Sequence, residues 1–351
     1  NSGFAKFNTS WGYDPFSDPM TLTWLEQPAS IATTAVTDVI LDFKPWFDPS
    51  DNQQYIFGLG STGKLYQIQP NTLNNPNVDS VVGITSIKAG NPTFTFGGSL
   101  ETFGATEKLY IGSDVGINTT ALPPIGAADT FIGNASNYVA NRARPLQVFA
   151  GKLAFGNGNT IGVIDATGTV TSSVIGTGQG NAYSQLNPPL PTSNFITDLD
   201  TSPDRNYLMI TSSEIPNEEI TSPPDDRQAA ATSSGNISQW NGYDTGITTA
   251  YAIPSFGVTA LQVYLQSNFF FSSDTFGAAV SDGQKKLLTL QNNKPPLANA
   301  TLVNGNFISW VAPEVLGTSS IGAALYYFGS LDQETPSGLY RLMRYTTNLP
   351  R

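Results

Sequence analysis

Short apolar or aromatic runs alternate with polar gaps along the whole chain. A typical run is followed by Gly, Asn, Ser or Asp, and then by another short run. A helical pattern of apolar positions at i, i+3, i+4 and i+7 is never sustained over three turns. The 33 glycines and 24 prolines also interrupt the chain too often for long helices. The pattern predicts strands joined by tight turns, and therefore an all-β fold.

A hairpin pattern repeats along the sequence. Its clearest copy consists of residues 54–58 and 64–68 around a turn at 61–63, and a later copy combines residues 152–156 with 160–165. Equivalent positions of six copies are spaced 44 to 62 residues apart: Tyr55, Leu109, Leu153, Tyr207, Phe269 and Leu325. Propeller blades of four strands repeat about every 40–50 residues, so the spacing fits blades with long loops.

Each hairpin follows another short run, which we expect to form the innermost strand of its blade. These runs are residues 39–41, 93–96, 146–149, 195–196, 261–264 and 321–323. The N-terminal runs 3–7 and 21–25 precede the first complete hairpin and need a partner. A strand from this segment that pairs into the last blade would remove an open sheet edge.

We therefore predict a single β-propeller of about six four-stranded blades, formed by residues 38–351 and closed by a strand from residues 1–37. Seven blades are the alternative if residues 1–37 build their own blade, and a two-domain β-sandwich is the structural rival. Residues 212–234 break the pattern, because they are acidic, rich in Pro and free of aromatic side chains. We expect them to form an exposed loop inserted between two paired strands of the fourth blade.

Composition excludes several classes of chemistry. The 351 residues include 16 Lys and Arg against 27 Asp and Glu, which gives a formal net charge of −11, and 39% of them are hydrophobic. So few basic residues argue against nucleic-acid binding, and no apolar run is long enough to cross a membrane. The chain has no Cys and no His, which excludes disulfides, thiol and imidazole catalysis and Cys/His metal sites. We expect no cofactor.

Acid–base chemistry without His would rest on carboxylates. The aspartates closest in sequence form three groups: Asp198, Asp200 and Asp204; Asp38 and Asp42; Asp225 and Asp226. Alternate residues of a strand point the same way, so Asp198 and Asp200 can share a face. This stretch runs into a turn sequence at 202–205, however, and turns favour Asp for local hydrogen bonds. A turn role is therefore the default, with catalysis or a cation site at the first group as the alternative.

Four aromatic residues near the N-terminus lie in surroundings rich in Pro and Asp. They are Trp11, Tyr13, Trp24 and Trp46. Burial in the core is the default interpretation of each, and stacking on a sugar is the alternative function that their side chains suggest.

Four stretches carry the repeat most clearly: residues 63–68, 144–159, 237–242 with 252–254, and 324–329. Together they resemble the β-propeller proteins of tailed-phage virions, including the propeller portions of tail nozzle or hub proteins. WD40 and Kelch signatures are absent. The resemblance implies a structural role without catalysis, in which the ring of blades is a rigid platform among symmetric neighbours in an extracellular particle.

The leading hypothesis is thus a non-enzymatic virion protein that acts in assembly or host attachment. Its expected partners are neighbouring virion proteins and copies of itself, with a host-surface glycan as a further candidate, and neither nucleic acid nor membrane insertion is expected. The alternatives are an extracellular carbohydrate-active propeller, working as a carboxylate-based glycosidase or lyase, and a secreted propeller that binds a glycan.

Overall fold

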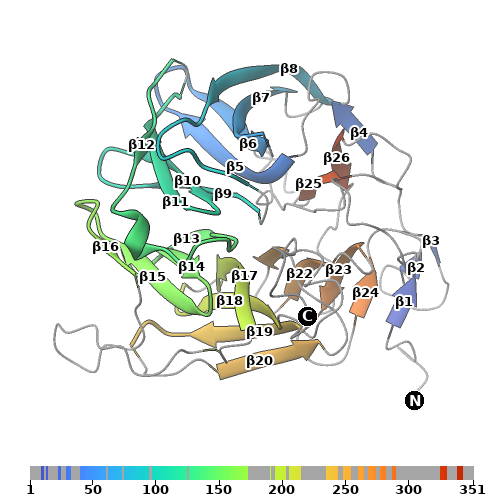
Figure 1. The fold of residues 1–351 in the computed structure, drawn as a ribbon. Helices are drawn as coiled ribbons and strands as arrows, with labels where there is room; N and C mark the ends of the chain where they lie inside the picture. Colours follow the sequence, from blue (N-terminus) through green and yellow to red (C-terminus); the bar gives the residue numbers. More distant parts are fainter. Residues whose placement is uncertain are drawn as a thin grey trace.

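The structure is a computed structural model that describes most of residues 40–172 and shorter stretches on either side. The described residues are 9–11, 13–14, 23–24, 29–32, 40–60, 62–72, 75–94, 97–124, 126–172, 190, 194–202, 205–214, 235–243, 248–253, 260–264, 268–273, 277–281, 287–289, 325–329 and 338–342. Figure 1 shows their sheets following one another around the molecule.

Strands make up almost all of the regular structure in these residues. The helical structure described is one 3₁₀ turn, Ala135–Asn137. The predicted all-β class is confirmed. No helix in the described part of the chain is long and apolar enough to span a membrane.

Four of the sheets contain four strands each, antiparallel and in chain order. The first sheet is β5 (Ile40–Asp48), β6 (Gln53–Gly60), β7 (Lys64–Thr72) and β8 (Asn75–Ser86). The second is β9 (Ser99–Phe103), β10 (Lys108–Ser113), β11 (Gly116–Ala121) and β12 (Thr130–Phe131). The third is β13 (Leu146–Phe149), β14 (Lys152–Asn157), β15 (Thr160–Ile164) and β16 (Val170–Thr171). The fourth is β17 (Asn194–Thr201), β18 (Leu208–Glu214), β19 (Gly235–Trp240) and β20 (Thr248–Ile253).

The C-terminal third of the chain forms two further sheets with strands from the N-terminus. One is β21 (Ala260–Tyr264), β22 (Asn268–Ser273), β23 (Gly277–Ser281) and β24 (Leu287–Thr289), with β1 (Thr9–Trp11) parallel to β24. The other is β25 (Leu325–Gly329) and β26 (Gly338–Leu342), with β4 (Ala29–Ala32) antiparallel to β26. The short strands β2 (Tyr13–Asp14) and β3 (Thr23–Trp24) pair with each other.

The N-terminal strand beside β26 is not one of the two runs expected to supply it. Residues 3–7 lie outside the described residues, and Thr23–Trp24 pairs with Tyr13–Asp14 instead. The strand that joins β26 is Ala29–Ala32. This run contains no aromatic residue, so a search for aromatic runs does not detect it.

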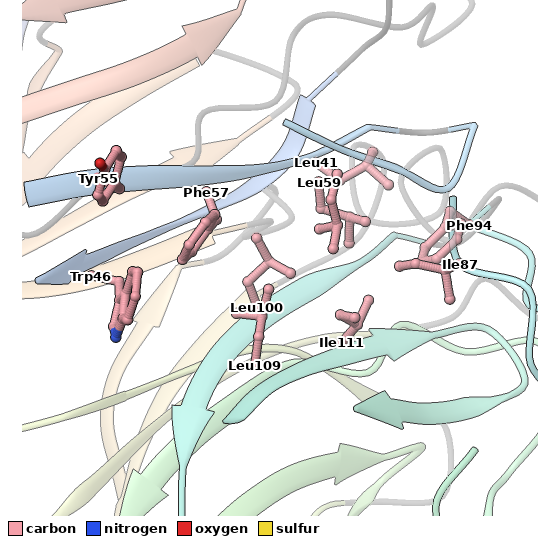
Figure 2. Packing of buried hydrophobic residues seen from close by; sticks show 11 residues of the cluster. Leu41, Trp46, Tyr55, Phe57, Leu59, Ile87, Phe94, Leu100, Leu109 and Ile111 are labelled. Carbon is pink, nitrogen blue, oxygen red and sulfur yellow. The ribbon is translucent and has the colours of Figure 1, made fainter. Parts of the chain in front are cut away.

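Second strands carry continuous apolar runs because their sheets are covered on both faces. In β10, Leu109 and Ile111 belong to the core cluster shared with the first sheet, whereas Tyr110 belongs to the cluster shared with the third. Successive side chains of a strand point to opposite faces, so a run of three apolar residues fills both layers. Figure 2 shows Leu109 and Ile111 facing Leu59 and Phe57 of the first sheet. Full burial of each such side chain stabilises the fold by about 1.5–3 kcal/mol.

The first strands of successive sheets contact one another. β5 contacts β9, β9 contacts β13, β13 contacts β17, and β17 contacts β21. The last sheet contacts the first through β25, which the repeat aligns with second strands and which contacts β5. Residues 321–323, expected as the first strand of the last sheet, lie outside the described residues. In the second sheet the first strand is Ser99–Phe103, so the prediction from residues 93–96 is wrong by a few residues. Phe94 lies in the preceding connection, where it is buried in the core between the first two sheets. Its apolar side chain fills that core without being part of a strand.

Antiparallel pairing divides the connections between two edges of the sheets. Turns between second and third strands leave the same edge as the crossovers to the next sheet, which include residues 87–98 and 132–145; this is the crossover edge. The opposite turn edge carries the connections between first and second strands and between third and fourth strands. Their described residues are 49–52, 104–107, 150–151, 202, 205–207, 122–124, 126–129, 165–169 and 241–243.

The predicted insertion at 212–234 falls between strands that do pair, because β18 and β19 are antiparallel neighbours. Residues 212–214 belong to β18, which ends at Glu214. Residues 215–234 lie outside the described residues.

Candidate functional site

Polar side chains lie on the first strands, where successive sheets meet. Lys44 of β5 forms an ion pair with Glu101 of β9. Asp42, two residues before Lys44, accepts a hydrogen bond from the backbone N–H of Leu100 at 2.7 Å through Oδ2. Because both contacts run between the first and second sheets, they join two first strands. The same residues would have to be released from these contacts to act on a ligand.

The next two first strands are joined in a similar way. Gln147 of β13 donates from Nε2 to Oγ1 of Thr201 in β17 at 3.5 Å. Polar contacts thus accompany the first strands from the first sheet to the fourth.

The carboxylate candidates Asp198 and Asp200 lie in β17, on alternate positions of one strand. Oδ1 of Asp198 accepts the backbone N–H of Leu199 at 2.8 Å, and Oδ1 of Asp200 accepts that of Thr201 at 2.7 Å. Asp198 is half-buried and Asp200 is buried. Both carboxylates therefore make local backbone hydrogen bonds, but from within a strand and not from the turn that the default interpretation expected. Asp204 lies outside the described residues.

Carboxylates do not gather into a metal-binding cluster in the described part of the chain. No group of three or more His, Cys, Asp or Glu residues there is arranged to hold a metal ion. Asp42 and Asp198 lie on different sheets, and Asp38, Asp225 and Asp226 fall outside the described residues.

Arg144 is the largest fully buried side chain that carries a charge in the described residues. It lies at the crossover edge, two residues before β13. Its guanidinium donates to five oxygen atoms: Ser113 O at 3.3 Å from Nε, Gly156 O at 3.4 Å and Asn157 Oδ1 at 2.7 Å from Nη1, and Asp114 O at 3.3 Å and Val139 O at 2.6 Å from Nη2. These partners belong to the second sheet, the third sheet and the crossover between them. Arg144 therefore fastens two sheets together.

Two groups near Arg144, the Tyr138 ring and Asp114, favour its positive charge. Its guanidinium lies 5.1 Å from the centre of the Tyr138 ring, a favourable cation–π geometry. Burial lowers the pKa of Arg144 to about 10, while Tyr138 and Asp114 act in the opposite direction. Burial raises the pKa of Tyr138, and the charge of Arg144 partly opposes this. The guanidinium stays charged at neutral pH, and its N–H groups already donate to protein oxygen atoms. Arg144 is therefore suited to stabilising the fold rather than to binding an anionic ligand.

The aromatic candidate Trp46 is a core residue. Its ring stacks on Tyr55 and Phe57, with centroid distances of 6.2 and 5.6 Å. Its Nε1 donates to Oε2 of Glu107 at 3.0 Å, across to the second sheet. Trp11 lies in β1, while Tyr13 in β2 and Trp24 in β3 face each other in the strand register.

Exposed aromatic side chains occur instead at the turn edge. Phe47 is 53% exposed near the end of β5, Tyr207 is 38% exposed just before β18, and Tyr243 is 70% exposed after β19. The repeat aligns Tyr207 with Leu109, which is fully buried. In the structure the fully buried residue at this point is Leu208 instead. A signal for both tyrosines exists in their neighbours, since the turn sequences Arg205-Asn206-Tyr207 and Asn241-Gly242-Tyr243 each end in an aromatic residue.

Comparison with known proteins gives likenesses of backbone shape without sequence relatives. No family model and no curated protein matches the sequence. The WD40 β-propeller domain of Doa1 is 12% identical, with 88% of this chain and 81% of that chain covered and a TM-score of 0.46. XC5397 from Xanthomonas campestris, a gluconolactonase, is 12% identical, with 90% and 94% covered and a TM-score of 0.48. The extracellular domain of BT4673 from B. thetaiotaomicron is also 12% identical with a TM-score of 0.48, and the chain spans 40% of its length.

Proposed function

We propose that this chain is a six-bladed β-propeller that serves as a non-catalytic structural module of a bacteriophage-like virion, in assembly or host attachment. The six sheets supply the blades, and the N-terminal strand β4 completes the last of them beside β26. The contact of β25 with β5 brings the last sheet back to the first. A closed ring leaves no free edge for unwanted strand pairing.

The proposal of a non-catalytic role rests on the contacts of the buried charged side chains. In the described residues five charged side chains are buried: Asp48, Glu101, Asp114, Arg144 and Asp200. Glu101 pairs with Lys44, Arg144 joins the second and third sheets, and Asp114 accepts the Thr93 hydroxyl at 2.9 Å. Asp48 and Asp200 accept N–H groups of residues one or two positions ahead. Acid–base catalysis needs a carboxylate within reach of substrate, whereas these groups hold the blades and turns in shape.

The virion role rests on the sequence resemblance and on composition. Three of the four resembling stretches include residues of second or third strands, in β7, β14 and β19, and the fourth covers β25. Low charge and abundant Asn, Thr, Ser and Gly suit a surface that is largely covered by neighbouring subunits. Localisation in the particle, and partners among its other proteins, follow from this proposal.

Cryo-microscopy of purified native particles, with mass spectrometry of their proteins, tests the proposal. The expected result is several copies of the chain in a symmetric ring or collar, each with six blades. Mass photometry of the isolated chain is the companion measurement. A chain that is absent from particles and remains a solitary 37.4 kDa monomer would overturn the virion role, and a density with a different number of sheets would overturn the six-bladed ring.

A further inference from the structure

Two exposed tyrosines lie next to adjacent strand ends at the turn edge of the fourth sheet. Tyr207 directly precedes β18 and Tyr243 follows β19 by three residues. β18 and β19 are antiparallel neighbours, and Leu208 lies opposite Trp240 in their register. The two tyrosines therefore emerge from adjacent strand ends at the same edge, with 38% and 70% of their surfaces exposed.

The backbone beneath Tyr207 is fixed by its own turn. Ser202 N–H donates to Tyr207 O at 2.9 Å, and Tyr207 N–H donates to the Ser202 hydroxyl at 3.0 Å. Arg205 N–H donates to Ser202 O at 2.8 Å, and Arg205 has a positive φ of 58°. These bonds hold the backbone of Arg205 and Tyr207 to Ser202.

The turn that carries Tyr243 is fixed by different means. Tyr243 N–H donates to Oδ1 of Asn241 at 2.9 Å. Gly242 has a φ of +83°, and a side chain there would approach the ring of Phe149 to 3.1 Å. The neighbouring Trp240 packs on the same Phe149 ring at a centroid distance of 6.3 Å. The backbone of each tyrosine is thus hydrogen-bonded to a neighbouring residue of its own connection, which lowers the cost of ordering it when a ligand binds.

The groups around the two rings are polar and of mixed type. Arg205 and Asn206 are exposed and Asn241 is half-buried. A guanidinium donates hydrogen bonds, and an amide both donates and accepts them. A sugar ring has apolar C–H faces and a rim of hydroxyls that both donate and accept. Aromatic faces beside two amides and one guanidinium suit that chemistry, and the net charge of −11 on the chain disfavours an acidic ligand.

We infer that Tyr207 and Tyr243, with Arg205 and Asn206 at their rim, form a subsite for a neutral glycan. The size of the surface favours a sugar over a protein partner. A stable protein interface buries about 800 Å² on each side, whereas the large exposed apolar side chains described at the turn edge of this sheet are these two rings. The inference rests on the proposed function for its biological role, because it names the ligand class of an attachment module.

The test is a glycan array probed with the labelled full chain. The array carries neutral hexose and N-acetylhexosamine oligosaccharides together with sialylated and uronic-acid ones. We expect binding to neutral members, measured afterwards in solution by calorimetry with the strongest of them. Tyr243→Ala is expected to weaken the affinity by about tenfold or more and Tyr207→Ala by about fivefold, since aromatic anchors dominate small binding surfaces. Tyr243→Phe should stay within about threefold, because it keeps the ring.

Phe47→Ala is the matched control, since it removes an exposed aromatic side chain from the same edge on another sheet. It should leave glycan affinity unchanged, and circular dichroism checks that every variant is folded. Absence of binding to neutral glycans, binding confined to acidic ones, or affinity untouched by both alanine variants would each overturn the subsite. So would a Tyr243→Ala variant that loses only a virion protein partner. Incorporation of Tyr243→Ala into particles is scored separately, so that the subsite can fail while the virion role stands, and the reverse.

Discussion

Nη1 of Arg144 donates to Oδ1 of Asn157 at 2.7 Å, and the same oxygen accepts the backbone N–H of Val139 at 2.7 Å. The amide nitrogen of Asn157 donates in turn to Asn137 O and Ser172 O, at 3.1 and 2.7 Å. One Arg–Asn contact at the end of β14 therefore holds the 132–145 crossover and the chain after β16 against the third sheet.

Replacing Arg144 should be strongly destabilising. Arg144→Met keeps much of the apolar stem but removes one hydrogen-bond donor from each of five buried oxygen atoms, and we expect a loss of about 3–5 kcal/mol in the free energy of unfolding. Urea denaturation measures it. Arg142→Met is the control, because Arg142 donates to the O atom of the adjacent Asn141 and should cost about 1 kcal/mol or less. Equal losses for the two variants would show that Arg144 is not the fastening group.

Gly112 shows why the second strand of the repeat has a glycine near its end. A Cβ atom there would lie 2.1 Å from Arg144 O and 2.6 Å from Oγ of Ser99, and Ser99 donates to that same Arg144 O. Gly112→Ala is expected to push the second sheet away from the chain entering the third and to lower the free energy of unfolding by about 3 kcal/mol.

Gly151→Ala provides the comparison for Gly112→Ala. Gly151 has a φ of +74° and nothing within 4 Å of its would-be Cβ, so only backbone strain of about 1 kcal/mol is expected. Thermal unfolding of both variants distinguishes steric clash from strain, and the prediction fails if Gly151→Ala is the more damaging change.

The recurring glycines illustrate how far the sequence leads. The Gly at the end of the second strand is visible at residues 112 and 156 from the repeat alone, and so is the all-β class. The cause is not visible in the repeat, because the crowding atoms come from elsewhere in the chain. Gly112 is crowded by Arg144 and Ser99, and Gly156 by Pro145 and by Ile196 of the fourth sheet. Pattern reasoning finds positions within a blade, whereas contacts between blades depend on which backbone oxygen meets which strand.

The candidate sites show the same limit. Core burial, the default interpretation of Trp46, is confirmed, but the residues of the second sheet that enclose it are not visible in the sequence. The repeat aligns Tyr207 with buried residues, whereas it is exposed one residue before its strand. A displacement of one residue reverses the side on which a strand residue lies. The first strand Ser99–Phe103 is hard to detect from sequence because it contains the charged residue Glu101. Glu101 is buried beside Lys44 of the adjacent first strand, with which it forms an ion pair.

The Lys44–Glu101 pair should behave as a coupled unit. Lys44→Met removes the cation beside a carboxylate whose side chain is only 5% exposed, and a loss of about 2–3 kcal/mol is expected. Glu101→Gln alone should also destabilise, but the double variant should lose less than the sum of the two, with a coupling energy of about 1–2 kcal/mol. A double-mutant cycle by urea denaturation measures it. Strict additivity would mean that the ion pair contributes nothing between β5 and β9.

If the chain were a carbohydrate-active enzyme, Asp198 and Asp200 would be its candidate catalytic residues. We expect the wild-type chain to release no sugar from the glycans that it binds, as measured by chromatography of products after long incubation. We also expect Asp198→Ala with Asp200→Ala to leave glycan binding unchanged. If the wild-type chain cleaves a glycan and the double variant does not, the non-catalytic role is wrong and β17 carries an active site.

Tyr55 gives the fold a dependence on alkaline pH. Its hydroxyl donates to the Asp51 carboxylate, and this hydrogen bond, together with burial and the charges of Asp51 and Asp48, raises the pKa of Tyr55 from 10.0 to about 12. Between these values the folded state retains a proton that the unfolded state releases, so the stability from this group is complete below about pH 10 and is lost as the pH rises towards 12.

Two variants isolate this contribution of Tyr55. Tyr55→Phe cannot ionise, so the gap in stability between it and the wild type should narrow from about pH 9 to about pH 11.5 in urea denaturation series. Asp51→Asn removes the largest cause of the shift, so its stability should fall less steeply over the same interval, and its tyrosine absorbance should show one residue titrating earlier. A gap between wild type and Tyr55→Phe that stays constant over this interval would mean that the Asp51 carboxylate does not hold the phenol proton, and that the 49–52 turn is maintained by the contacts of Asp48 with Ser50 and Asn52 instead.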